Sequence, residues 1–357
     1  MNAHGLHASG FGAIFLMPAL LVAGAWIGRE WLAFGVAICV FPLARLLLGA
    51  LPADPPRWGE AVATRLDRLP VLYAPALVAS VAASAALVLR EPASTAALAG
   101  YGLSLWMALL FATCVAHELF HRRDRRQAAL GHMLAGFCGY PLLGVEHLAH
   151  HARPGDTARA ECPRVDESVW AFAGRRLRRI GREFLGPGAP LWSASAGQPS
   201  LMRLRLALIT TAVTAAAAAA FAGWHALVLY AAVAAGVAFG VQLITYIQHW
   251  GLGDDHVPDR VAYGRGWEED CRFQAWITLN ISLHDGHHRD ARRPYYRLGL
   301  TADSPRLPAS YVLLMFAAMV PPVWFRVMTP ALGYWLRSPA SPVSAGRRLT
   351  CFGFFSQ

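Results

Sequence analysis

The sequence contains no lysine and few charged residues of any kind. All 32 basic residues are arginine, charged residues make up 15% of the 357 residues, and the formal net charge is +10. Soluble domains carry about 25% charged residues, so this composition argues against an ordinary soluble domain. The arginines lie in loops between apolar segments, which the positive-inside rule explains better than nucleic-acid binding does. We therefore expect no nucleic-acid partner.

Cysteine pairs that could hold a metal cluster are also missing. No two of the six cysteines form a Cys-x-x-Cys pattern: Cys39, Cys114, Cys138, Cys162, Cys271 and Cys351. A fused rubredoxin, an iron–sulfur motif and a zinc ribbon are therefore excluded. The chain also lacks a basic segment before its first apolar run, so we expect a retained membrane anchor there rather than a cleaved secretory signal.

Long apolar segments dominate the chain, and 55% of its residues are hydrophobic. Six segments are near the ~20 residues that cross a bilayer core: Phe11–Gly28, Trp31–Leu51, Leu69–Leu89, Thr95–Ala116, Leu204–Ala222 and Trp224–Tyr246. We expect a tight turn at Gly223, a buried or re-entrant segment over Ala128–Val145, and a helix at the membrane surface over Tyr311–Met328. The sequence thus predicts an all-α integral membrane protein with six transmembrane helices.

The distribution of arginine predicts the orientation of these helices. The turns after the first and third segments each hold one arginine, whereas three follow the second segment and four follow the fourth. Because the arginine-rich side is cytoplasmic, we expect the N-terminus in the cytoplasm and the protein in the inner membrane. Residues 1–337 are expected to form a single membrane-embedded domain, followed by a C-terminal tail over residues 338–357.

Nine of the 14 histidines occur in four places, all expected at the cytoplasmic ends of helices. The four places are His117 and His121; His147, His150 and His151; His249; and His284, His287 and His288. Residues three or four apart share one side of a helix, so these histidines could converge on one assembled site. Imidazole suits iron, zinc, copper and nickel, and nine ligands are too many for one ion, which favours two. A lone histidine is more often a packed or solvated residue, as we expect for His132 and His225.

Carboxylates beside metal-bound imidazoles usually accept the second ring N–H and so orient the ring. Glu118 and Glu146 are the main candidates for this role, followed by Asp285 and Asp290, with ordinary solvated charges as the alternative. Among the possible metals, iron is the one that would give such a site reactivity towards O2. The membrane location then implies an apolar substrate that reaches the site from the bilayer.

At these residues the sequence resembles the membrane-bound non-haem di-iron family that contains fatty acid desaturases, alkane 1-monooxygenases and the hydroxylase component of xylene monooxygenase. Residues 117–123 (HELFHRR) match the first histidine box of the hydroxylases, and residues 246–252 (YIQHWGL) are similar to their extra motif. Residues 168–172 and 321–325 are also similar. Three features depart from the hydroxylase pattern: the second box has only two residues between His147 and His150, Gln248 replaces the glutamate of alkane hydroxylases, and Asp285-Gly286 fills the last box.

The resemblance implies a monooxygenase with two iron ions held by the nine histidines. Such an enzyme hydroxylates a terminal or benzylic methyl group of an alkane or alkylbenzene with O2. Its electrons would come from a rubredoxin or a ferredoxin-type donor with its reductase, docked on the arginine-rich face. A fatty acyl desaturase or lipid hydroxylase of the same superfamily is the first alternative. A metal transporter is the second, although it would need more polar residues within the spans than this chain has.

Overall fold

The computed structural model describes residues 3–52, 54–89, 94–192, 199–257 and 265–338, and over these ranges the chain is helical and contains no strand. The first half comprises α1 (Ala3–Gly10), η1 (Phe11–Phe15), α2 (Leu16–Trp26), α3 (Leu32–Cys39), η2 (Phe41–Leu43), α4 (Ala44–Leu48), α5 (Glu60–Val88), α6 (Thr95–Phe120), α7 (Arg125–Phe137) and α8 (Leu143–Ala152). The second half comprises α9 (Val169–Leu185), η3 (Pro190–Trp192), α10 (Pro199–His249), α11 (Arg272–Ile277), α12 (His284–Arg289), η4 (Tyr295–Arg297), α13 (Tyr311–Met319) and α14 (Pro321–Arg337). The all-α prediction is confirmed.

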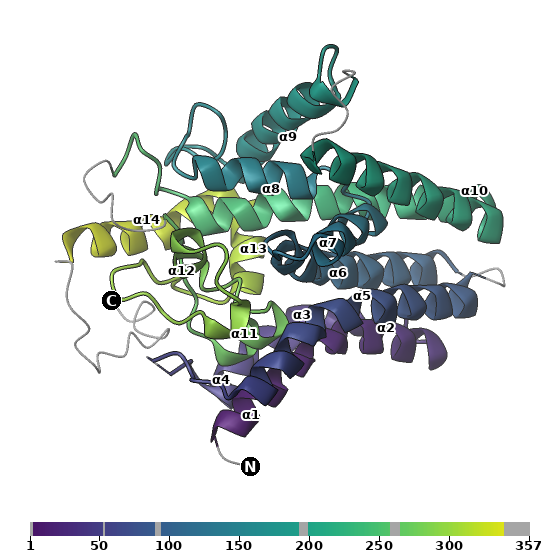
Figure 1. Cartoon of the computed structure of the whole chain (residues 1–357), viewed down its shortest axis with the longest axis horizontal. Helices are drawn as coiled ribbons and strands as arrows, with labels where there is room; N and C mark the ends of the chain where they lie inside the picture. The colour runs from purple at the N-terminus through teal and green to yellow at the C-terminus, as the bar shows by residue number, and fades with distance from the viewer. Residues whose placement is uncertain (1–2, 53, 90–93, 193–198, 258–264, 339–357) are drawn as a thin grey trace.

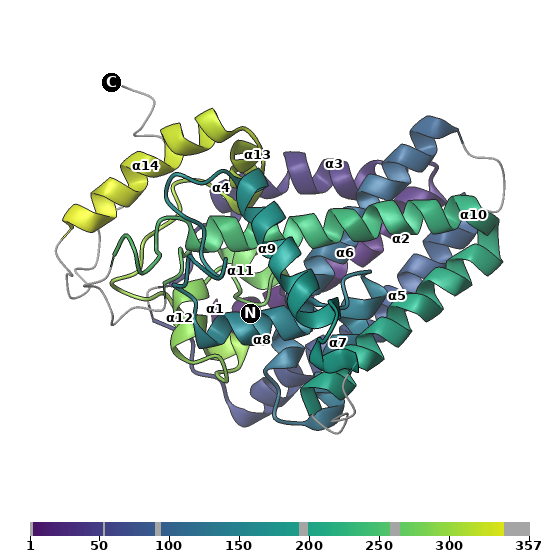
Figure 2. The ribbon, with the colours of Figure 1, turned by 90° about the horizontal axis from the view of Figure 1, so that it is seen from above.

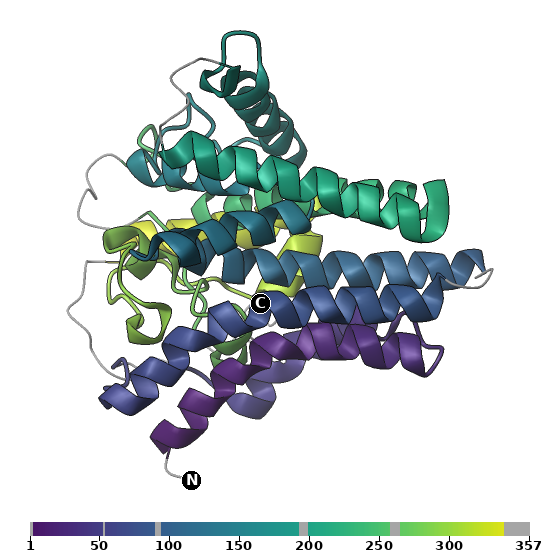
Figure 3. The same cartoon turned by 45° about the vertical axis from the view of Figure 1, so that its right-hand side comes forward.

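Four helical segments of the described chain are long and apolar enough to cross a membrane: Leu6–Trp26, Glu60–Val88, Thr95–Phe120 and Leu201–His249. Figure 1 shows that α2, α5, α6 and α10 extend together towards one end of the molecule, and Figure 3 shows them stacked side by side. Short helices and loops occupy the opposite end. The predicted membrane protein is therefore confirmed at the level of its apolar helices.

The longest segment, α10, is a hairpin of two helices. Ala222 and Gly223 have non-helical backbone angles, and the φ of Gly223 is 72°, a left-handed conformation that glycine adopts readily. Figure 2 shows the chain reversing at this point, so that the two arms of α10 diverge from the turn. The predicted turn at Gly223 is confirmed.

The segment expected as the second span is not one continuous helix. It is divided into α3, η2 and α4, and Leu32–Leu48 is too short to count among the four long segments. Pro42 lies in η2 and has no backbone N–H to donate, which interrupts the α-helical hydrogen bonds at that point. The predicted second span, Trp31–Leu51, therefore contains a shorter apolar segment, Leu32–Leu48, that is interrupted at η2.

The N-terminal residues contact α11, which lies far from them in the sequence. The helix α1 begins at Ala3, and His7 within it is buried. The indole Nε1 of Trp276 donates to Nδ1 of His7 at 3.0 Å, and the ring of Trp58 is stacked on the imidazole. The N-terminus is thereby tied to α11, close in sequence to the last histidine cluster.

Two apolar segments that we expected not to span are indeed short. Residues 128–145 are divided between α7 and α8, and the segment from Tyr311 is broken at Val320, directly before Pro321, into α13 and α14. The α7–α8 pair packs beside α6 and returns the chain to the end of α6. The expected tail lies outside the described residues after Ser338.

The elements that carry histidine end in one region of the molecule. The C-terminal ends of α6 and α10, together with α8 and α12, lie where the long helices meet the short helices and loops (Figures 1 and 2). α6 is the most enclosed of the long helices, because 72% of its most apolar stretch is buried inside the molecule. The fold therefore presents the histidines at the end of a rigid helical bundle.

Candidate metal centre

The first two histidines lie at the end of α6. His117 and His121 are four residues apart, which places them on one side of the helix, and α6 ends at Phe120, so that His121 is its C-terminal capping residue. Asp124 then caps α7 by accepting hydrogen bonds from the backbone N–H groups of Arg126 and Gln127, so the chain turns sharply after the second histidine. Both imidazoles are thus held by helical backbone rather than by a mobile loop.

The helix α8 carries His147, His150 and His151. It packs closely on α7, since a Cβ on Gly144 would lie 2.3 Å from the ring of His132. The shortened box places His147 and His151 four residues apart, and their Nε2 atoms are 2.9 Å from each other. Despite the unusual spacing of the second box, His147 therefore lies with the other histidines. His132 is fully buried and belongs to no histidine group among the described residues.

His249 is the last residue of α10. Gly251 follows with a φ of 73°, the left-handed conformation common just beyond a helix C-terminus. The backbone N–H of Leu252 donates to the carbonyl of His249 at 3.0 Å, which closes the helix end. The glycine therefore stops the helix directly after the histidine and leaves its buried imidazole at the end of the bundle.

The short helix α12 carries the remaining three histidines and is fastened by buried carboxylates. Oε1 of Glu268 accepts from the backbone N–H of Gly286 at 3.2 Å. Asp285 accepts from the backbone N–H of Gly266 at 3.3 Å and from Ser304 at 2.5 Å. These bonds hold a helix of only six residues that could not persist on its own.

The nine histidines form two groups, and in each group one ring nitrogen per residue lies within 4.8 Å of the others. The five-histidine group consists of His117, His121, His147, His151 and His287. The four-histidine group consists of His150, His249, His284 and His288. Pairs four residues apart stay in one group, whereas His150 and His287 each leave their helical neighbours and join the other group. The expectation of one common face for each triplet is thus too simple.

The nitrogen spacings in both groups suit the ligands of a metal ion. In the five-histidine group, Nε2–Nε2 distances are 2.8 Å for His121–His147 and 3.0 Å for His151–His287. In the four-histidine group, the corresponding distances are 3.0, 2.9 and 3.0 Å for the pairs His150–His249, His249–His284 and His284–His288. Metal–nitrogen bonds of about 2.1 Å at right angles place neighbouring nitrogens about 3 Å apart.

The hydrogen bond of His249 determines which of its nitrogens is free to bind. Nδ1 of His249 lies 2.7 Å from the carbonyl oxygen of Arg265. A carbonyl oxygen only accepts, so Nδ1 carries the proton, and Nε2 of the neutral ring presents its lone pair to His150 and His284. Three lone-pair nitrogens facing one another repel unless a cation lies among them. The donor set therefore fits a bound metal ion.

The carboxylates that we expected to orient the imidazoles have other partners. Glu118 lies 3.0 Å from Nη2 of Arg122, and Glu146 accepts from the Tyr140 hydroxyl and from Nε2 of Gln242. Among the described residues, neither lies within ion-pair distance of a histidine, and the exposed Asp290 pairs with Arg293. Sequence reasoning missed Glu161, whose Oε2 lies 3.4 Å from Nδ1 of His150. Its only sequence signal was its position soon after the second box.

Burial keeps the imidazoles outside the spans neutral. It lowers the pKa of His121 to about 4 and that of His151 to about 3. The pKa values of His150 and His287 are also well below the ordinary histidine value, because burial and then neighbouring imidazoles oppose protonation. Neutral imidazole is the form that binds metals, so both groups are ready to bind at neutral pH.

A cavity touches both groups. It is lined by Thr113, Cys114, His117, Leu143, Glu146, His147, His150, Arg176, Val241, Ile244, Thr245, Gln248, His249, Ile281 and His284. Three of these residues belong to the four-histidine group and two to the five-histidine group. Its other walls include the aliphatic side chains of Leu143, Val241, Ile244 and Ile281 and the polar side chains of Glu146, Arg176 and Gln248. Its two threonine hydroxyls donate to carbonyls of their own helices. The cavity therefore has an aliphatic wall beside the histidines, together with a polar one.

Comparison with known proteins agrees with this arrangement. The family model "Fatty acid desaturase" matches residues 93–327. Alkane 1-monooxygenase 1 of Pseudomonas aeruginosa is 28% identical over 84% of this chain and 82% of its own length. Alkane 1-monooxygenase of Ectopseudomonas oleovorans is 26% identical over 90% and 84%. The xylene/toluene monooxygenase hydroxylase component XylM of Pseudomonas putida is 25% identical over 92% and 90%.

Proposed function

Because the chain belongs to the fatty acid desaturase family, we propose that it is a membrane monooxygenase that hydroxylates a terminal or benzylic methyl group of a hydrocarbon. The observation that carries this proposal is the cavity that touches both histidine groups and has four aliphatic side chains in its lining. The relatives named for alkane and for xylene/toluene oxidation support it, since they align over most of this chain.

The two histidine groups would hold two iron ions, one in each group. All nine donors are neutral nitrogens, which is a ligand type that suits iron, and no carboxylate belongs to either group within the described ranges. When bound, iron supplies the activation of O2 for insertion of one oxygen atom into a C–H bond. The protein holds the ligands at fixed positions and shields the site from water.

The cavity walls would bind and orient the hydrocarbon. Leu143, Val241, Ile244 and Ile281 offer aliphatic surface, which favours an alkyl or aryl group over water. A methyl group held against these residues is presented to the histidine groups, so the geometry selects the reacting carbon. Holding a reactant in this way accounts for a large part of a typical rate enhancement.

The cytoplasmic side of the membrane is the proposed location of the site, with six spans in an inner-membrane protein. The four long segments provide five of these spans when the α10 hairpin is counted twice, and Leu32–Leu48 would provide the sixth with a break. A reporter fused after Arg126, or within residues 152–200, should read as cytoplasmic, and one near Gly223 should read as periplasmic.

The same fusions test whether the histidines can meet. Alkaline phosphatase and green fluorescent protein give opposite signals on the two sides of the inner membrane, so each junction is read twice. If the junction after Arg126 and a junction within residues 152–200 gave opposite results, residues 128–145 would cross the membrane. The proposed shared site would then be abandoned.

Electrons would come from a separate protein, which we propose is a rubredoxin or a ferredoxin-type donor with its reductase. This chain has no Cys-x-x-Cys pattern, and exposed arginines such as Arg123, Arg125 and Arg126 follow the first histidine box. A cationic surface of this kind attracts an acidic carrier. We further propose that residues 1–337 act as one domain.

Product analysis tests the proposed reaction directly. Cells expressing the chain with a rubredoxin and its reductase are fed n-alkanes, alkylbenzenes and fatty acids under 18O2, and the extracts are analysed by mass spectrometry. We expect 1-alkanols or benzyl alcohols that contain one 18O atom, and no product with His287→Ala. Unsaturated acyl chains without added oxygen would instead establish the desaturase alternative.

A further inference from the structure

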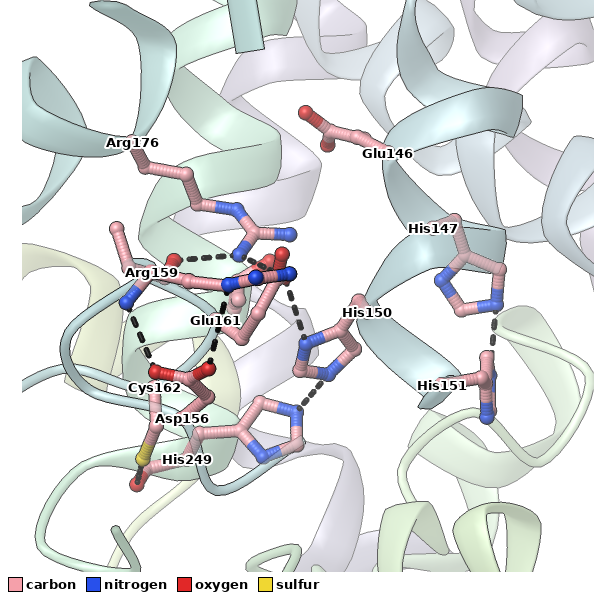
Figure 4. A network of polar contacts seen from close by, with 12 residues as sticks. Glu146, His147, His150, His151, Asp156, Arg159, Glu161, Cys162, Arg176 and His249 are labelled. Carbon is pink, nitrogen blue, oxygen red and sulfur yellow. Dashed lines mark hydrogen bonds and ion pairs between the residues drawn. The ribbon is translucent and has the colours of Figure 1, made fainter. Parts of the chain in front are cut away.

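A line of polar contacts runs from the four-histidine group to α9. Nε2 of His249 faces Nε2 of His150, and Nδ1 of His150 faces Oε2 of Glu161 at 3.4 Å. Glu161 is only 2% exposed and is paired with the guanidinium groups of Arg176, at 2.7 Å, and Arg179. Figure 4 shows Glu161 between Arg176 and His150, with His249 beyond. The carboxylate therefore bridges a histidine and two cations.

The loop after α8 is shaped to deliver this carboxylate. Ala160 has a φ of 58°, a left-handed conformation that is uncommon for residues other than glycine and costs free energy. Its carbonyl accepts a hydrogen bond from Arg176 at 2.6 Å, and the N–H of Glu161 donates to the carbonyl of Asp156 at 2.9 Å. A strained backbone that places a buried charge against a histidine indicates a role at the site rather than chance packing.

The contact of Glu161 is particular to one of the two groups. Within the described ranges, His150 is the only one of the nine histidines with a carboxylate oxygen within 4.0 Å of a ring nitrogen. Nδ1 of His150 has no hydrogen-bond partner among the described residues, and Oε2 of Glu161 at 3.4 Å lies within ion-pair distance of it without forming a hydrogen bond. An ionised carboxylate can only accept hydrogen bonds, so it favours the tautomer with the proton on Nδ1 and leaves Nε2 with its lone pair towards His249.

We propose that Glu161 is a positioning residue that fixes the tautomer and orientation of His150 and thereby makes the four-histidine group a stronger donor set than the five-histidine group. A carboxylate at the second nitrogen raises the basicity of a metal-bound imidazole. Arg176 and Arg179 keep Glu161 in place. This inference rests on the proposed function, because it assumes one iron ion in each group.

The test compares Glu161→Gln with Glu183→Gln by Mössbauer spectroscopy of 57Fe-loaded protein. Glu183 is a matched control because it pairs with the same Arg179 at 2.6 Å but is exposed and is not in contact with a histidine. We expect two iron doublets in the wild-type protein, a shift of one doublet only in Glu161→Gln, and an unchanged spectrum in Glu183→Gln. A chelator should also remove one of the two irons from Glu161→Gln at roughly 10–100-fold lower concentration.

Several results would overturn the inference. An unchanged spectrum in Glu161→Gln, or equal changes in both doublets, shows that Glu161 does not act through His150 alone. If Glu161→Gln does not accumulate, Glu161→Asp takes its place, since it keeps the charge for both arginines but withdraws it from His150, and the same single shift is expected. A wild-type protein without iron would overturn the proposed function itself. If the wild-type protein holds two irons but the Glu161 variants show no single shifted doublet, only the role of Glu161 is overturned.

Discussion

Replacement of His249 by alanine is expected to abolish hydroxylation and to lower the iron content. His249 is central to the four-histidine group, with its Nε2 at 3.0 Å from Nε2 of His150 and 2.9 Å from Nε2 of His284. Loss of a residue that hydrogen-bonds to a metal ligand already lowers metal affinity or activity about 10–100-fold. Loss of the ligand itself should therefore leave less than about one-hundredth of the activity. Turnover of the hydrocarbon and iron per chain measure the two effects.

The neighbouring Gln248→Ala variant provides a contrast for His249→Ala. Gln248 lines the cavity, and its Nε2 lies 3.5 Å from the carbonyl of Ile281. Since it belongs to neither histidine group, its replacement should leave both irons bound and change the rate or the preferred substrate. Normal turnover with two irons in His249→Ala would remove His249 from the ligand set and would favour the desaturase alternative.

The second large effect is expected for His287→Ala, which should lose iron and activity together. His287 comes from α12 but lies in the five-histidine group, with its Nε2 3.0 Å from that of His151 and its ring centroid 4.4 Å from that of His117. His287 is the one residue of α12 in the five-histidine group, whereas His284 and His288 belong to the four-histidine group. Its loss therefore removes one ligand and also the link that α12 makes between the two groups. Metal analysis and product formation are measured on the same preparation.

His225→Ala is the control for this experiment. His225 is exposed beside the turn at Gly223, at the tip of the α10 hairpin, and its ring packs on Trp224. Its replacement should change neither iron content nor turnover. Full iron occupancy in the His287→Ala protein would show that the five-histidine group binds its metal without this residue. His287 would then be removed from the nine assigned ligands.

Helical periodicity explains how much of the site could be predicted. Successive residues of an α-helix are rotated by about 100°, so residues four apart differ by about 40° and residues three apart by about 60° in the opposite direction. The pairs His147–His151 and His284–His288 therefore point alike and stay in one group, whereas His150 and His287 point elsewhere. The list of nine histidines needed only the spacing, but the choice of group needed the positions of the neighbouring helices.

The second predicted span and the carboxylate of Glu161 show where local sequence patterns were not enough to predict the structure. The composition of residues 31–51 is apolar enough for a span, but Pro42 divides the segment into three short pieces. Glu161 could not be singled out, because its contact with His150 depends on the left-handed Ala160 and on two arginines of α9. Side-chain contacts of this kind depend on how a loop folds back on a distant helix.

The sequence by itself determined that this is an all-helical membrane protein with nine histidines at helix ends, because hydropathy and the spacing of side chains along a helix are local properties. It also determined the hairpin of α10, since glycine can adopt the backbone angles of a tight turn. Only the tertiary structure decided that the histidines divide into groups of five and four and that Glu161 faces His150. Those relations depend on how α6, α8, α10 and α12 pack against one another, which no single stretch of sequence encodes.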